Sequence, residues 1–139
     1  MSLPHWKYHG HVYPKVRVNG RAVNVHALIA EDVLGRSLPP GAQIHHVDED
    51  PTNFMRSNLV ICQDMAYHKL LHMRAAVVEV GGNPNTDLFC NGCRRAKPRD
   101  DFHVNRALLS GRLSKCKPCH CAYQSERKLA LASRRSRQV

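Results

Sequence analysis

The chain has no long apolar run and few acidic residues. No stretch approaches the roughly 18 uninterrupted apolar residues that a membrane-spanning helix needs, which argues against an integral membrane protein. The first residues contain no apolar region of the kind that directs secretion, so we expect a cytoplasmic protein. No internal repeat covers both halves of the 139 residues, which leaves one modest domain, or one domain with a small appendix.

The shortage of acidic residues gives the chain a strong positive charge. Only 11 Asp and Glu stand against 21 Lys and Arg, so the formal net charge is +10. A polyanion is the simplest partner for such a chain, and nucleic acid is a better candidate than a membrane surface. Hydrophobic residues make up 42% of the sequence, which is enough for a small core.

Four of the six cysteines form two Cys-x-x-Cys pairs. Cys90 and Cys93 make the first pair, and Cys116 and Cys119 make the second. In a reducing compartment this spacing indicates a structural zinc site with four thiolate ligands rather than disulfides. A module of about 35 residues cannot build an adequate core, so the ion would supply most of its folding energy.

The remaining cysteines leave two points open. His120 and Cys121 are alternatives to Cys119 as the fourth ligand, although Cys119 keeps the two-residue spacing. Cys62 lies in a short apolar run, where we expect a buried thiol that behaves as a small hydrophobic side chain.

Four histidines between residues 45 and 72 form the most informative pattern. His45 and His46 are neighbours in a strand-like run, and His68 and His72 are four residues apart. On a helix, that spacing places both imidazoles on one face. With a third His from a nearby strand they could hold one divalent metal and leave coordination positions open for chemistry. Because neighbouring strand residues point to opposite faces, we expect one of the His45-His46 pair to bind metal and the other to act as a base.

The run His45-His46, Asn58-Leu59, His68 and His72 resembles the ββα-metal motif of the HNH endonucleases. The resemblance covers about residues 12–74 and is closest to members with a second helix histidine, such as the DNase colicins. It implies that His45, His68 and His72 ligate one divalent ion, which could be Mg, Mn, Ni or Zn. It also implies that His46 is the general base and that Asn58 braces the loop and orients His46. The implied catalytic set is therefore His46, His45, Asn58 and His68.

The segment from Val25 to Glu31 resembles the lead-in helix of phage and homing HNH endonucleases. The cysteine module, with Lys97-Pro98 and Asp101-Phe102 between its pairs, resembles zinc ribbons appended to phage-type members. These likenesses imply a metal-dependent endonuclease that nicks or cuts double-stranded DNA, in a bacterial host cell and with a phage gene as one source. They leave a monomer and a homodimer both open, and the lack of a long apolar run leads us to expect no membrane partner.

Two other functions compete with the DNA nuclease. A non-catalytic, zinc-dependent DNA-binding or accessory protein would share the charge and the cysteine module, but it would have no reason to keep the four histidines in this arrangement. A nuclease that acts on RNA is the third reading.

The pattern of elements predicts an α+β fold. Asn19-Gly20, between stretches of alternating apolar and basic residues, predicts a β-hairpin over residues 13–25. We expect its apolar face to pack on the core, and its other face to carry basic residues that contact phosphate. The expected apolar side chains are Val16, Val18, Val23 and Val25, and the expected basic ones are Lys15, Arg17 and Arg21.

A short helix is expected over residues 26–34, closed by Gly35, with its apolar side formed by Leu28, Ile29, Val33 and Leu34. His26, at its start, is expected to cap or pack rather than bind metal. Strands are expected at 43–47 and 59–62. A helix over 65–80, capped by Asp64, should direct its apolar positions to the core. Those positions are Leu70, Leu71, Val77 and Val78.

The predicted domains are an HNH nuclease domain over 12–80, a zinc-ribbon DNA-binding module over 87–131 and a basic tail over 132–139. The tail is expected to be disordered after a helix at 123–131 and to touch phosphate nonspecifically. Further phosphate contacts are expected from basic residues of the module. They are Arg94, Arg95, Lys97, Arg112 and Lys117.

Overall fold

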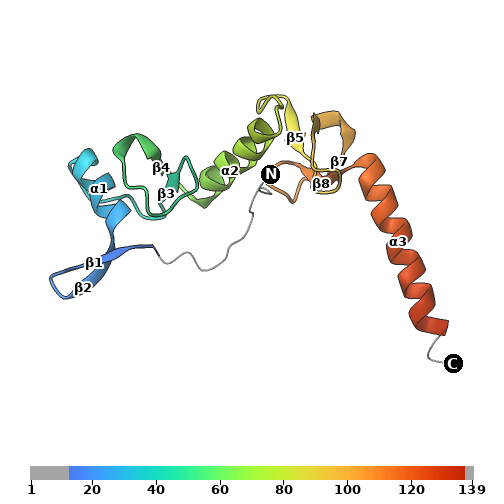
Figure 1. The fold of residues 1–139 in the computed structure, drawn as a ribbon, viewed down its shortest axis with the longest axis horizontal. Coiled ribbons are helices and arrows are strands. Elements are labelled where there is room, and N and C mark those ends of the chain that lie inside the picture. The colour runs from blue at the N-terminus through green and yellow to red at the C-terminus, as the bar shows by residue number, and fades with distance from the viewer. Residues whose placement is uncertain (1–12, 137–139) are drawn as a thin grey trace. The chain divides into compact units, whose positions relative to one another are not determined.

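The structure is a computed structural model that describes residues 13–136 of the chain. The N-terminal residues on which the expectation of no leader rests, and the last three residues of the predicted tail, lie outside the described part. The chain divides into two compact units, Met1–Leu71 and His72–Val139. Within residues 13–136 it contains three α-helices and four two-stranded antiparallel sheets, which confirms the α+β class (Figure 1). The predicted domain limits stay predictions.

The first unit begins with the predicted hairpin. β1 (Lys15–Val18) pairs with β2 (Arg21–Asn24) across Asn19-Gly20, and both turn residues have the positive φ, 49° and 80°, that a tight two-residue hairpin turn needs. This turn places Val18 directly opposite Arg21.

Two expectations about the faces of the hairpin are wrong. Residues directly opposite in an antiparallel pair share a face, so Arg21 lies on the face of Val16 and Val18 and not beside Lys15 and Arg17. All four residues of β1 are exposed, with Val16 at 43%, so this strand does not pack on a core. A two-stranded ribbon of this length has too little surface of its own to bury its valines.

α1 (Val25–Leu34) follows β2 without a break and ends at Gly35, whose φ of 65° confirms the predicted cap. His26 and Ala30, one turn apart, are its buried residues. Val33 and Leu34 are exposed, contrary to expectation, because the buried side of α1 is limited to the line through His26 and Ala30.

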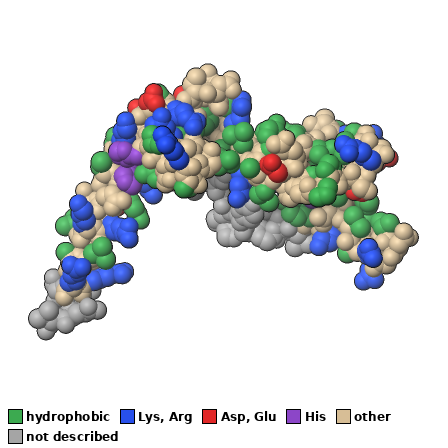
Figure 2. All heavy atoms as spheres, turned by 180° about the vertical axis from the view of Figure 1, so that it is seen from behind, with side chains coloured by type: hydrophobic (Ala, Val, Ile, Leu, Met, Phe, Trp, Pro, Cys, Tyr) green, Lys and Arg blue, Asp and Glu red, His purple; other side chains and the backbone are tan. Residues whose placement is uncertain are grey.

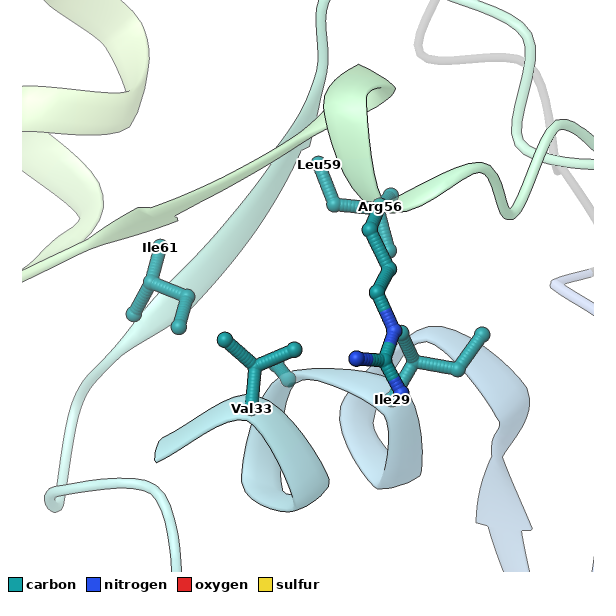
Figure 3. Close-up of a pocket in the computed structure, with 6 residues that line it drawn as sticks. Ile29, Val33, Arg56, Leu59 and Ile61 are labelled. Atoms are coloured by element: carbon teal, nitrogen blue, oxygen red, sulfur yellow. The ribbon is translucent and has the colours of Figure 1, made fainter. Parts of the chain in front are cut away.

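β3 (Gln43–His46) and β4 (Leu59–Cys62) form the second sheet, with His45 opposite Val60 and His46 opposite Leu59. α1 contacts both strands, and a small pocket remains between the helix and β4 (Figure 3). Arg56, in the short 3-10 helix Arg56–Asn58, extends over this pocket and forms an ion pair with Asp32 at 2.6 Å. Both charged side chains are mostly exposed, so the pair adds little stability.

α2 (Met65–Glu79) begins as predicted, because the Asp64 carboxylate accepts the Tyr67 backbone N–H at 2.8 Å. Val77 is buried as expected. Leu70 and Val78 are exposed, which contradicts the expectation that they face the core. The boundary between the two units falls within this helix.

The second unit contains two small sheets and a long helix. β5 (Asp87–Phe89) pairs with β6 (Ala96–Pro98), and β7 (Phe102–Val104) pairs with β8 (Arg112–Cys116). A 3-10 turn (Arg99–Asp101) lies between β6 and β7. The buried centre consists of Phe102 with Cys90 and Cys116, so two of its three members are candidate metal ligands.

α3 (Lys117–Ser136) starts earlier and ends later than predicted. Residues 133–136, expected to be disordered, are helical. After Pro118, which the first turn of a helix tolerates, the sequence has no further Pro or Gly and is rich in Ala, Leu, Lys and Arg, all good helix formers.

The glycine that follows α2 gives a test of packing in the second unit. A Cβ on Gly82 would lie 2.3 Å from the Ala96 Cβ and 2.8 Å from Val77 Cγ1. We expect Gly82→Ala to lower the free energy of unfolding by about 1–3 kcal/mol, because neither neighbour has a flexible end that can move aside. Urea unfolding followed by circular dichroism measures this. Adding Ala96→Gly should recover part of the loss, and a Gly82→Ala protein as stable as the parent would contradict this packing.

Candidate metal centres

Three histidines from two elements come together in the structure. His45 of β3 and His68 and His72 of α2 each offer one ring nitrogen, and these nitrogens lie within 4.8 Å of one another. His45 is 5% exposed, and the ring centroids of His45 and His68 are 5.3 Å apart. Three neutral imidazoles at this spacing, one of them buried, fit a divalent ion with coordination positions left over for water or substrate. The group consists of the same three histidines that the resemblance to HNH endonucleases implies as ligands.

His46 has different neighbours. Its ring lies 6.1 Å from that of Tyr13 in a nearly parallel arrangement and 5.3 Å from that of His26. The side chain is 6% exposed, and its Nε2 has no hydrogen-bond partner among the described residues. Burial lowers the pKa of His46, although the Asp48 and Asp50 carboxylates oppose this shift. Near neutral pH the ring is therefore uncharged and keeps a nitrogen lone pair that can accept a proton.

His26 is the residue whose place the sequence did not reveal. It is buried at the start of α1, and its ring meets that of Tyr13 edge-on at 5.0 Å. Burial lowers its pKa, and the nearby His46 lowers it further. Its packing agrees with the expectation from sequence. That it packs against His46 was not expected, because this contact depends on how α1 lies on β3. The sequence signal is slight, since His26 is only one turn before the buried Ala30.

Asn58 braces the loop between β3 and β4. Its Oδ1 accepts the Asp48 backbone N–H at 3.0 Å, and its Nδ2 donates to Asp48 Oδ1 at 2.7 Å and to the Asn53 carbonyl at 3.1 Å. The amide of Asn53 donates to the other Asp48 oxygen at 2.6 Å. These bonds hold the pKa of Asp48 low, with the Asn53 bond as the largest cause. The bracing role is visible, whereas no hydrogen bond from Asn58 to the unpartnered His46 Nε2 is present in this part of the chain.

The four paired cysteines gather in the second unit. Cys90, Cys93, Cys116 and Cys119 each place a sulfur within 4.8 Å of the others, whereas His120 and Cys121 do not join this group in the described chain. The Cys90 sulfur accepts backbone N–H groups from Cys116 at 3.2 Å and from Gly92 at 3.4 Å. The spacing and the four-sulfur donor set fit zinc.

The thiols of this cluster would give up protons when a cation binds. Burial raises the pKa of Cys90, but the backbone N–H groups that point at its sulfur outweigh burial and bring the pKa to about 6. Hydrogen bonding with Cys116 raises the pKa of Cys119 to about 12. The pKa of Cys93 is raised as well, first by burial and then by hydrogen bonding with Cys90, so without a cation Cys93 and Cys119 stay protonated beside the Cys90 thiolate. A divalent ion would displace the protons from these thiols, and its positive charge would offset the repulsion between the resulting thiolates.

The predicted DNA-binding residues do not all have free charges. The Arg112 guanidinium donates to the Phe102 carbonyl and to Asp100, both at 3.0 Å, and its side chain is only 20% exposed. Arg94 lies over the Phe89 ring, 5.0 Å from its centroid. Lys117 is exposed at the start of α3, as are Lys15 and Arg17 on the hairpin.

Comparison with protein families finds a similarity within the first unit. Residues 23–64 match the family model described as HNH endonuclease. Over this segment the chain is similar to HNH endonucleases. The matched segment includes His26, the His45-His46 pair and Asn58, and it supports a nuclease function in general. It ends before α2, so His68 and His72 lie outside it.

A search of curated proteins and a search of solved structures each found no match to the chain. None of the helices between residues 13 and 136 combines the length and the apolar character needed to span a bilayer.

The cysteine cluster leaves no room for a side chain at Gly92. A Cβ there would lie 2.6 Å from the Cys119 Cβ and 2.8 Å from its sulfur. We expect Gly92→Ala to displace Cys119 and to lower zinc retention after dialysis to well below one ion per chain, measured by elemental analysis. Asn91→Ala, at the exposed neighbouring position, should retain zinc like the parent. Full retention by Gly92→Ala would contradict this geometry.

The buried His26 should make the first unit sensitive to mild acid. Its folded-state pKa lies below the unfolded value, so its contribution to stability is complete above about pH 6.5 and is lost as the pH falls towards the folded pKa. We expect the free energy of unfolding in urea to fall between pH 7.5 and 5.5, and to fall less in His26→Gln. An equal loss in both proteins would show that His26 does not carry this dependence.

Proposed function

We propose that this protein is a metal-dependent DNA endonuclease. His45, His68 and His72 would hold one divalent ion, and His46 would be the general base. The observation that carries this proposal is the meeting of three imidazoles from β3 and α2, one of which, His45, belongs to the segment that matches the HNH endonuclease model. A binding protein needs no such cluster.

The bound ion would act as a Lewis acid that stabilises negative charge on the scissile phosphate. Three neutral imidazole ligands suit Zn, Ni or Mn at least as well as Mg. His46 would accept a proton from the attacking water at Nε2, the nitrogen without a hydrogen-bond partner. Asn58 would fix the loop that follows β3 and so hold the backbone that carries the base. The products would carry 5′-phosphate and 3′-hydroxyl ends.

One observation favours a second function, that of a DNA-binding protein without catalysis. His46 is almost fully buried against Tyr13 and His26, whereas a general base must reach a water molecule. The cleavage experiment separates the two functions, since a binding protein would shift DNA but never cut it.

Nicking of supercoiled plasmid with added Mg, Mn, Ni or Zn tests the nuclease. We expect cutting that EDTA abolishes and that His46→Ala slows by about 10²–10⁴-fold, the usual contribution of a general base. His72→Ala should raise the metal concentration needed for half-maximal cutting, because it removes one of the three ligands.

His103→Ala serves as the control, because His103 is an exposed imidazole of the second unit outside the three-histidine group. It should cut like the parent. The nuclease proposal fails if the parent shows no EDTA-sensitive cutting with any of the four metals, and the role of His46 fails if His46→Ala cuts as fast as the parent.

A further inference from the structure

α3 is the least covered element of the second unit. From Cys121 to Arg135 every residue except Gln124 is exposed. The helix contacts β8 near its beginning, and Cys119 ties its first turn to the cysteine cluster. A helix exposed on all sides over most of its length either stays in water or meets a partner that is absent from the chain itself.

The basic side chains of α3 form two adjacent rows. Lys117, Lys128 and Arg135 are 11 and 7 residues apart, which is about three and two turns, so they lie above one another. Arg127 and Arg134 form the second row, since each comes one residue before a member of the first row. Basic side chains recur along the face of α3 shown in Figure 2.

The side of α3 opposite the row of Lys117, Lys128 and Arg135 carries no Lys or Arg. Glu126 is the one acidic residue of α3, and helical spacing places it nearly opposite the row of Lys117, Lys128 and Arg135. Cys119 also lies on that opposite side, so the attachment to the cysteine cluster leaves the row free. The positive charge is thus concentrated on one side of the helix.

The apolar side of α3 is interrupted by polar residues. Ala122, Tyr123, Leu129 and Ala130 lie on the side away from the first basic row, but Glu126 and Ser133 fall among them. Leu129 and Leu131 are both exposed but only two residues apart, which puts them on nearly opposite sides of a helix. A membrane-surface helix or a coiled-coil partner would need an apolar face at three- and four-residue spacing that no acidic residue interrupts. The arrangement favours a polyanion over an apolar partner.

We propose that the two basic rows of α3 bind the phosphates of duplex DNA. The choice of DNA rests on the proposed function. The rows extend over about 27 Å of helix, and a helix about 10–12 Å across fits the major groove of B-form DNA, which is about 12 Å wide. The deep, narrow major groove of duplex RNA does not admit a helix. The second unit therefore holds DNA through α3, and the cysteine cluster fixes the start of that helix.

The test uses full-length protein that carries His46→Ala, so that DNA binding is measured without cutting. Arg127, Lys128, Arg134 and Arg135 are changed together to Gln, a residue that keeps helix propensity. We expect duplex DNA to bind at least about tenfold more weakly, and the slope of log K against log salt to fall by about 0.9 for each phosphate that the protein no longer neutralises. Unchanged affinity and slope would overturn the proposal.

A charge-matched variant separates the rows from net charge. Lys128→Gln and Arg135→Gln are combined with Leu129→Lys and Ser133→Lys, which moves two cations to the other side of α3 at constant total charge. We expect this protein to bind as weakly as one with the two Gln substitutions alone. Recovery of parental binding would mean that charge alone matters, and the proposal would fall.

Two further measurements complete the test. Zinc content and helicity equal to those of the parent show that the variants are folded, so that weak binding reports the removal of the basic side chains. Tighter binding to duplex RNA or to anionic vesicles than to DNA would overturn DNA as the partner. Because binding and cutting are measured in separate proteins, a parent that binds through α3 but never cuts would overturn only the nuclease.

Discussion

The side chain of Asn58 joins the two strands on which the histidine site depends. It bonds both the backbone and the carboxylate of Asp48 and also reaches the Asn53 carbonyl, so one buried amide closes the loop between β3 and β4. A buried polar group satisfied in this way is costly to disturb, because every partner would be left without a bond. The loop therefore sets how β3 meets β4, and β3 carries both His45 and His46.

Much of the fold follows from local signals in the sequence. Asn19-Gly20 predicts the hairpin, Gly35 predicts the end of α1 and Asp64 predicts the start of α2, because each residue acts on its own backbone. The errors concern side-chain exposure. Val16 stays exposed and Leu70 faces solvent because burial depends on which elements cover them, and local sequence does not encode that.

The candidate sites divide in the same way. Spacing predicts the His68-His72 pair and the four-cysteine cluster, since i, i+4 histidines and Cys-x-x-Cys pairs are local patterns. The choice of His45 as the third histidine follows from the resemblance to HNH endonucleases. The neighbours of His46 could not be predicted from sequence, because Tyr13 and His26 reach it only after α1 packs on β3. The basic rows of α3 were missed for another reason: a helix expected to end near residue 131 excludes Arg134 and Arg135.

The His45-His46 pair shows how closely two different environments can adjoin in a sequence. One ring meets His68 and its neighbour meets His26, although the two residues have identical side chains. Their surroundings differ because neighbouring residues of β3 point to opposite faces of the sheet. Inserting or deleting one residue earlier in this strand would turn each of the two rings to the opposite face of the sheet, while the composition of the segment would stay almost unchanged. The number of histidines would be the same after such a change, and only the position of each histidine along the strand would differ.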